Sequence, residues 1–290
     1  MTVEVQTVET LSQVTQTLND STRYFAGGTL LMRQVNYGDQ SINRLVVSRD
    51  PELKRIQVSG DQIEIGAGVT MSDIISHQDL GFLAQVARAV GGPAIRNMAT
   101  VGGNLFAPCP YGDMATALLA LGAILVWADG QQQPIEQLFS HQENQLRSPD
   151  VGTNGSEFSA TNDLSRGNQN VVASIRLRKP RSGAFRFQKV SRVKPKGVSL
   201  LSVAVHLGRE SGRVANTRIA FGGMSARPRR ALAAEQALQG ASLDEAGIER
   251  CISMCNDGLE PQNDALASAW YRAQVAPVYL KRLLLQRGEY

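Results

Sequence analysis

One segment constrains this chain more than any other: residues 92–113 (GPAIRNMATVGGNLFAPCPYGD), which carry four glycines and three prolines around Thr100, Asn104 and Asp113. The segment leads directly into an apolar run at 117–127. Glycine has no Cβ, so a glycine-rich backbone can approach a ligand closely and adopt positive φ. The successive backbone N–H groups from Thr100 to Asn104, with one hydroxyl and one amide, suit phosphate oxygens. A turn-rich connector is the simpler interpretation of an isolated Gly-Gly pair.

Two further glycine clusters lie upstream, at 26–29 (AGGT) and 65–70 (IGAGVT). Three clusters of glycine and hydroxyl residues in the N-terminal half favour one shared ligand. The cluster at 65–70 also has part of a dinucleotide fingerprint. However, Met71 stands where a third glycine is required, and no acidic residue follows at the expected distance. We therefore expect a strand-to-helix turn there.

Length and composition are those of a globular protein. A chain of 290 residues and 31.4 kDa predicts roughly two domains. No apolar run reaches the ~20 residues that cross a bilayer, and the N-terminus lacks the apolar core of a signal peptide. We therefore expect a cytoplasmic protein without a membrane span. Cys109, Cys251 and Cys255 form neither a disulfide framework nor a metal cage, so no metal site is predicted in this chain.

Positive charge is concentrated between Arg181 and Arg230, where twelve Lys or Arg residues face one acid, Glu210. A solvated basic face, an anionic cofactor and an acidic partner surface are all compatible with this pattern. Nucleic acid fits less well, because aromatic residues that could stack on bases are scarce in the stretch.

Periodicity and turn signals predict an α+β fold, with strands followed by helices in the second half. Thr70 and Asp73 predict a capping box at the start of a helix, and Gly60-Asp61 predicts a hairpin turn. The polar stretch 141–170 is expected to be a long surface loop, because it has too few apolar residues to offset its ordering entropy. The expected strands are 23–26, 45–48, 56–59, 62–65, 123–128, 171–177, 184–190, 199–207 and 214–223. The expected helices are an N-terminal one carrying Val8, Leu11, Val14 and Leu18, then 30–37, 79–91, 114–121, 231–239, 243–256 and 268–286.

With these motifs laid out, the chain resembles the flavin-binding subunit of the molybdenum hydroxylases, the family of xanthine dehydrogenase and aerobic carbon monoxide dehydrogenase. The motifs are AGGT (26–29), IGAGVT (65–70), IRN to TVGGN (95–104) with Pro110 and Asp113, LLALGA (118–123), FQKVSR (187–192) and IAFGGMSARPRRA (219–231). The resemblance implies a two-subdomain FAD-binding domain of the PCMH or vanillyl-alcohol-oxidase type at 1–179, with subdomains of about 1–55 and 56–179. A C-terminal domain like that of the CO dehydrogenase flavoprotein is implied at 180–290.

The same resemblance implies noncovalent FAD and its site residues. The loop Phe25, Ala26, Gly27, Gly28, Thr29, Leu30, Leu31 and Met32 would line the flavin and the pyrophosphate. Thr100, Val101, Gly102, Gly103 and Asn104 would cradle the diphosphate and ribityl. Asp113 would bond ribose or ribityl hydroxyls, Lys189 would approach the flavin, and Val171 or Val172 would contact the isoalloxazine. Leu30 departs from the polar residue that many relatives carry, and the stretch 141–170 is longer than the usual connector.

The function implied by the resemblance is electron transfer. A molybdopterin-binding large subunit would oxidise the substrate, and [2Fe-2S] clusters of a small subunit would relay electrons to FAD here, which would pass them to NAD or another acceptor. A dimer of heterotrimers is expected. No catalytic residue is predicted, since His77, His141 and His206 are scattered singly and the flavin carries the chemistry. Two alternatives stay open: a self-sufficient flavoenzyme, for which Cys109 is the only candidate flavin tether, and a scaffold subunit without flavin.

Overall fold

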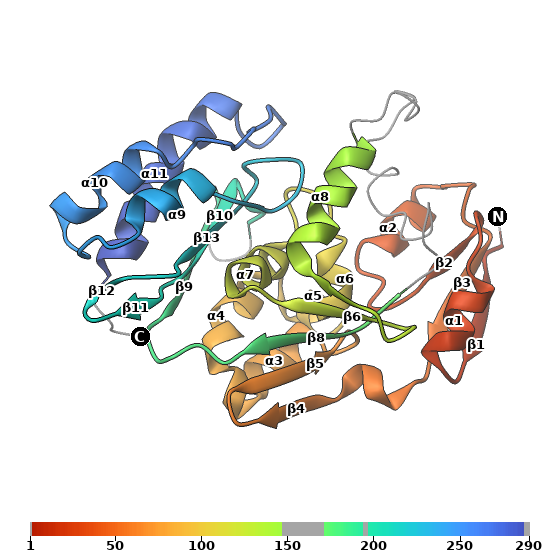
Figure 1. Cartoon of the computed structure of the whole chain (residues 1–290). Helices are drawn as coiled ribbons and strands as arrows, with labels where there is room; N and C mark the ends of the chain where they lie inside the picture. The colour runs from red at the N-terminus through yellow and green to blue at the C-terminus, as the bar shows by residue number, and fades with distance from the viewer. Residues whose placement is uncertain (1, 147–170, 194–196, 287–290) are drawn as a thin grey trace.

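The computed structural model describes residues 2–146, 171–193 and 197–286, which form three main sheets and one small two-stranded sheet with their helices (Figure 1). The N-terminal unit (4–48) is a three-stranded sheet in the order β1-β3-β2 with both pairs parallel. Parallel neighbours need a crossover connection, and α1 and α2 lie in the two connections. The elements are β1 (Glu4–Val8), α1 (Leu11–Thr17), β2 (Thr22–Tyr24), α2 (Leu31–Asn36) and β3 (Arg44–Ser48).

The central unit (56–178) is built on a five-stranded antiparallel sheet in the order β4-β5-β8-β6-β7. The hairpin predicted around Gly60 is confirmed: Val58 pairs with Ile63, and Gly60 turns the chain with a φ of 61°. The short helix η1 (Pro51–Lys54) leads into the sheet. The strands are β4 (Ile56–Ser59), β5 (Gln62–Gly66), β6 (Ile124–Trp127), β7 (Gln132–Pro134) and β8 (Val172–Arg178).

In Figure 1, α7 and α8 are drawn above β6, with α7 near the middle of the molecule. The predicted capping box is confirmed, since Thr70 and Asp73 bond each other's backbone at the start of α3. Every residue of α7 is buried, as expected for a helix that is apolar on all sides. It contacts both β10 (Leu201–His206) and β13 (Arg218–Gly222) of the C-terminal sheet. The helices are α3 (Met71–Ser76), η2 (Gln78–Leu80), α4 (Gly81–Ala89), α5 (Pro93–Arg96), α6 (Val101–Leu105), α7 (Asp113–Leu121) and α8 (Ile135–Leu146).

The C-terminal unit (185–286) has a four-stranded antiparallel sheet in the order β14-β13-β10-β9, packed against three helices. This is the strands-then-helices arrangement that the sequence predicts. Its elements are β9 (Phe185–Val190), β10 (Leu201–His206), β11 (Arg209–Glu210), β12 (Arg213–Val214), β13 (Arg218–Gly222), β14 (Arg229–Arg230), α9 (Leu232–Leu238), α10 (Glu245–Ser253) and α11 (Ala269–Leu285).

The segment 92–113 contains two short helices, α5 and α6. Two expectations need correction. Val8 ends β1 instead of belonging to the first helix. The polar stretch does not begin at 141, since α8 continues to Leu146. The rest of that stretch, 147–170, lies outside the described residues.

The length of α8 is explained by its contacts with the rest of the protein, although its composition is mostly polar. Ile135, Leu138 and Phe139 are buried at the start of the helix. On the polar side, Glu136 and Glu143 are seven residues apart and form ion pairs with Arg230 and Arg229 of β14. These contacts from the C-terminal unit hold the helix. Within the described part of the chain, no helix is long and apolar enough to cross a membrane.

Candidate functional site

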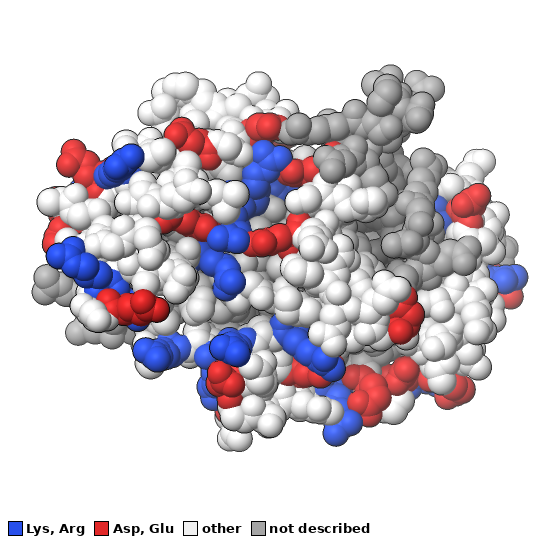
Figure 2. Space-filling model, in the orientation of Figure 1, with Lys and Arg blue, Asp and Glu red and all other residues white. Residues whose placement is uncertain are grey.

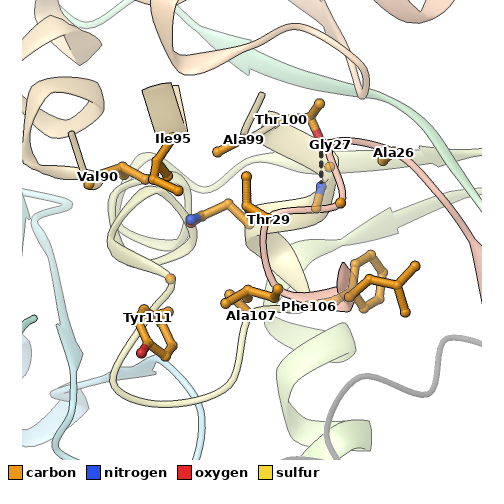
Figure 3. Close-up of a pocket in the computed structure, with 18 of the residues that line it drawn as sticks. Ala26, Gly27, Thr29, Val90, Ile95, Ala99, Thr100, Phe106, Ala107 and Tyr111 are labelled. Carbon is orange, nitrogen blue, oxygen red and sulfur yellow. Dashed lines mark hydrogen bonds between the residues drawn. The ribbon is translucent and has the colours of Figure 1, made fainter. Parts of the chain in front are cut away.

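All three units contribute to one cavity of about 300 Å³. In Figure 3, Val90 and Ile95 lie on one side of the cavity, and Gly27 and Thr100 lie on another. Most predicted site residues line it: Ala26, Gly27, Gly28, Thr29, Leu30, Leu31, Thr100, Gly102, Gly103, Asn104, Asp113, Val171, Val172 and Lys189. Among the described residues, the lining leaves out Phe25, Met32 and Val101.

The first glycine loop comes close to the backbone of the central segment. A Cβ on Gly27 would lie 1.9 Å from the carbonyl oxygen of Met98, so only glycine allows this approach. Gly28 has a φ of 66°, which again favours glycine, and the ring of Phe25 packs beside it. The loop therefore brings strand β2 to the cavity and holds it there.

The backbone N–H groups of this loop are the groups with which it could bind a ligand. From Ala26 to Leu31 they donate to no acceptor among the described residues, and Leu30 begins α2 without a side-chain cap. Successive N–H groups on a curved backbone form a concave site for anions. These residues line the cavity, so this loop is suited to phosphate oxygens.

The central helical turn uses its N–H groups differently from the prediction. Val101 and Gly102 donate to the carbonyls of Val69 and Ala67, at 2.9 and 2.8 Å. Gly103 and Asn104 donate to Thr100, at its Oγ1 (3.1 Å, dashed in Figure 3) and its carbonyl (3.0 Å). The N–H groups of 101–104 therefore already have acceptors within the protein, and the contact of Thr100 to Asn104 with the diphosphate and ribityl stays a prediction. Only the Thr100 hydroxyl and the Asn104 amide remain available to a ligand.

The third glycine cluster serves packing. A Cβ on Gly66 would lie 2.4 Å from the Leu53 carbonyl oxygen, and Gly68 donates to that same oxygen at 2.7 Å. Of this cluster only Ala67 reaches the cavity. The strand-to-helix turn predicted at 65–70 is confirmed, between β5 and α3. We expected all three glycine clusters to face one ligand, but the glycines of the cluster at 65–70 do not line the cavity.

Asn104 and Asp113 meet at the N-terminus of α7. The Asn104 Oδ1 accepts from the N–H of Ala115 at 3.1 Å, which satisfies one of the first-turn donors of α7. This bond fixes the orientation of the amide, so its NH2 group is the part left to donate elsewhere. Gly112 precedes the helix with a φ of 99°, and Asp113 places a carboxylate in the first turn, where the helix dipole favours it.

The Asp113 carboxylate is already bonded on both oxygens. Lys189 of β9 lies 3.0 Å from Oδ2, and the Ser199 hydroxyl donates to Oδ1 at 2.6 Å. Lys189 also donates to the Ala89 carbonyl at 2.7 Å. The positive charge of the Lys189 ammonium is therefore neutralised by the buried carboxylate of Asp113.

Several lining residues escaped the sequence reasoning. Arg33 of α2 donates to the Tyr111 hydroxyl at 3.0 Å, a bond that raises the pKa of Arg33. Burial, followed by the charge of Asp50, raises the pKa of Tyr24 to about 12, so this phenol stays neutral. Ser199 also lines the cavity. None of these positions carried a local signal, because each depends on tertiary contacts.

Part of the basic stretch 181–230 is paired within the protein. Arg229 and Arg230 pair with glutamates of α8 and α9. Arg186 donates to carbonyls at the end of α11. Desolvation lowers the pKa of buried Arg227 to about 10. Figure 2 accordingly shows basic and acidic residues interspersed on this face, and the interior ion pairs supply the reason for much of the basic charge.

The lining of the cavity fits a dinucleotide cofactor such as FAD. The loop N–H groups suit a diphosphate, the Thr100 hydroxyl and Asn104 amide suit sugar or ribityl hydroxyls, and most of the remaining lining is apolar. Arg23 and Arg33 also line the cavity, and among its described lining residues the carboxylate of Asp113 is paired with Lys189.

Comparison with known proteins agrees with this geometry. The profile of the FAD binding domain in molybdopterin dehydrogenase matches residues 1–151, and that of the CO dehydrogenase flavoprotein C-terminal domain matches 186–287. The glyceraldehyde dehydrogenase medium chain of Sulfolobus acidocaldarius is 25% identical, covering 90% of this chain and 88% of that one. The putative xanthine dehydrogenase FAD-binding subunit of Escherichia coli K12 is 24% identical, covering 92% and 88%.

Solved structures share the fold. A chain of carbon monoxide dehydrogenase from Hydrogenophaga pseudoflava superposes with a TM-score of 0.81 at 24% identity, covering 97% of this chain and 95% of that one. A chain of quinoline 2-oxidoreductase from Pseudomonas putida 86 gives 0.80 at 23% identity, covering 98% and 96%. The fold class expected from the sequence is confirmed, and the cofactor is FAD. The chain belongs to the family of FAD-binding subunits of molybdopterin dehydrogenases, the xanthine and carbon monoxide dehydrogenase type.

Proposed function

We propose that this chain is the electron-transfer subunit of a multi-subunit molybdenum hydroxylase. It would receive electrons from iron–sulfur clusters of a small subunit and deliver them to NAD or another acceptor, while a large molybdopterin subunit oxidises the substrate. The observation that carries the proposal is the row of residues from Ala26 to Leu31, whose N–H groups have no acceptor among the described residues and which line a cavity to which all three units contribute. FAD bound there supplies the redox chemistry.

The residues of the chain would bind and orient the cofactor. The N–H groups of 26–31 would hold the diphosphate, and the Thr100 hydroxyl and Asn104 amide would bond to sugar or ribityl hydroxyls. Val171 and Val172 would supply an apolar contact. Gly102 and Gly103 would let the cofactor lie against the helical turn. We propose no ligand contact for Phe25, Met32 and Val101, and a supporting role for Asp113 and Lys189.

The assembly is proposed on the same basis. The relatives are medium or FAD-binding subunits by name, which supports large and small partner subunits, arranged as a dimer of heterotrimers. We also propose a cytoplasmic location, with domain boundaries at 1–179 (subdomains about 1–55 and 56–179) and 180–290.

The test is purification of the tagged chain from its native host. We expect a molybdopterin protein and an iron–sulfur protein to co-purify, and the complex to reduce an acceptor when its substrate is supplied. The chain alone should oxidise no organic substrate. Robust oxidation by the isolated flavin-loaded chain would instead identify a self-sufficient flavoenzyme, and a partner-free chain without flavin would identify a scaffold.

A further inference from the structure

A buried ion pair joins the C-terminal unit to the central unit at the wall of the cavity. Lys189 and Ser199 come from the C-terminal unit, and Asp113 begins α7 of the central unit. The side chains of Lys189 and Asp113 are only 12% and 6% exposed. All three residues line the cavity. The wall is therefore made by the contact between the units and does not belong to either one alone.

The two charges are held in complementary places. Lys189 donates to the carbonyl of Ala89, the last residue of α4, where the negative end of the helix dipole favours a cation. Asp113 lies in the first turn of α7, where the positive end favours an anion. Each charge thus has its ion-pair partner and a favourable helix end.

Burial makes the pair dependent on both members. Removing one partner of a buried ion pair leaves an uncompensated charge and is strongly destabilising, whereas replacing both is often close to neutral. Because both carboxylate oxygens of Asp113 are already bonded to Lys189 and Ser199, loss of Lys189 would expose the anion to the cavity, beside an anionic cofactor.

We propose that Asp113, Lys189 and Ser199 form an interdomain latch, which docks the C-terminal unit and completes the FAD cavity. In this account the two charged residues are positioning residues that act on cofactor affinity as one unit. The inference rests on the proposed FAD site, and it predicts non-additive effects. Independent contacts of Asp113 and Lys189 with the cofactor would instead give effects that add.

The experiment is a double-mutant cycle on the full-length chain, with FAD affinity measured by titration of the apoprotein. Lys189→Met alone should weaken FAD binding about a hundredfold or more, as expected for an unpaired buried carboxylate. Adding Asp113→Asn should restore affinity to within about tenfold of the parent, because the uncompensated charge is gone. Ser199→Ala should weaken binding only about tenfold or less, since it removes one hydrogen bond to a charged group.

A matched control is Lys179→Met. Lys179 pairs with Asp79 at 2.8 Å, but the pair is 40% and 30% exposed and does not line the cavity. Exposed pairs contribute little, so FAD affinity should stay within about threefold of the parent. If this control lowers affinity as much as Lys189→Met does, the latch is not specific and the inference fails.

The latch would be overturned if the double variant loses as much FAD affinity as the two single variants lose together. So would unchanged affinity in Lys189→Met. If Lys189→Met does not fold, the double variant must fold, and its failure would also overturn the inference. A wild-type chain that binds no FAD would refute the proposed function. The cycle measured on unfolding midpoints of the apoprotein would then still decide whether the latch couples the units.

Discussion

Gly103→Val is the substitution that best separates the cofactor site from the fold. Gly103 lines the cavity, and the only atom within 4 Å of an added Cβ is Thr100 Oγ1, at 3.0 Å. Its φ is not positive, so the backbone accepts a side chain without left-handed strain. A valine would therefore project into the space that the cofactor needs.

The expected magnitude follows from these contacts. Crowding of Thr100 Oγ1 weakens the bond that caps α6, and loss of such a cap costs about 1 kcal/mol of stability. Forcing extra methyl groups into a packed site costs typically ~1–3 kcal/mol, which lowers affinity by about one to two decades. FAD should be lost or strongly weakened while the fold survives.

The assay is FAD titration of the apoprotein, with circular dichroism and thermal unfolding to follow the fold. Gly81→Ala is the matched control, because Gly81 has a φ of −51° and an added Cβ there would meet no atom within 4 Å. It should bind FAD like the parent. If Gly103→Val keeps stoichiometric FAD at parental affinity, the turn at 100–104 is only a connector and the assigned site is wrong.

Three further predictions concern stability, thiol reactivity and the cavity wall. Arg272→Met should lower the free energy of unfolding by about 3 kcal/mol or more, since the guanidinium is buried and bonds the Leu200 and Ala267 carbonyls and Asp264. The control Lys281→Met, which breaks an exposed pair 3.6 Å from Glu245, should lower it by less than about 1 kcal/mol. Equal unfolding midpoints for the two variants would refute this prediction. Cys251 and Cys255 should resist alkylation at mildly alkaline pH until the protein is denatured, because burial raises the pKa of both thiols to about 12. Mass spectrometry that finds either thiol alkylated in the native protein would contradict this prediction. Asn104→Leu should lower the free energy of unfolding and the free energy of FAD binding by about 1 kcal/mol each, because it removes the acceptor of the Ala115 N–H and a donor in the cavity. An unchanged unfolding midpoint would show that the bond to Ala115 does not stabilise the fold.

Local signals in the sequence predicted much of the fold. The capping box of Thr70 and Asp73, the hairpin at Gly60 and the strand-to-helix turn at 65–70 all depend on residues close in sequence. The same holds for the apolar run that becomes α7, because its composition leaves burial as the only stable outcome. These elements could be predicted because few distant contacts decide them.

The errors share one cause, which is tertiary contact. The N–H groups of Val101 and Gly102 are consumed by carbonyls of the turn at 65–70, a pairing that local sequence does not reveal. The glutamates of α8 look like part of a solvated stretch until Arg229 and Arg230 pair with them. Most of the predicted site residues line the cavity, but the sequence could not reveal that Asp113 and Lys189 bond each other.

The most direct test of the central claim is the release of flavin from the purified native complex. Heat or acid denaturation should liberate stoichiometric FAD into the supernatant, identified by chromatography and fluorescence, with none left on the precipitated chain. Absence of FAD from carefully prepared complex, or flavin that stays attached to this chain, would contradict the account.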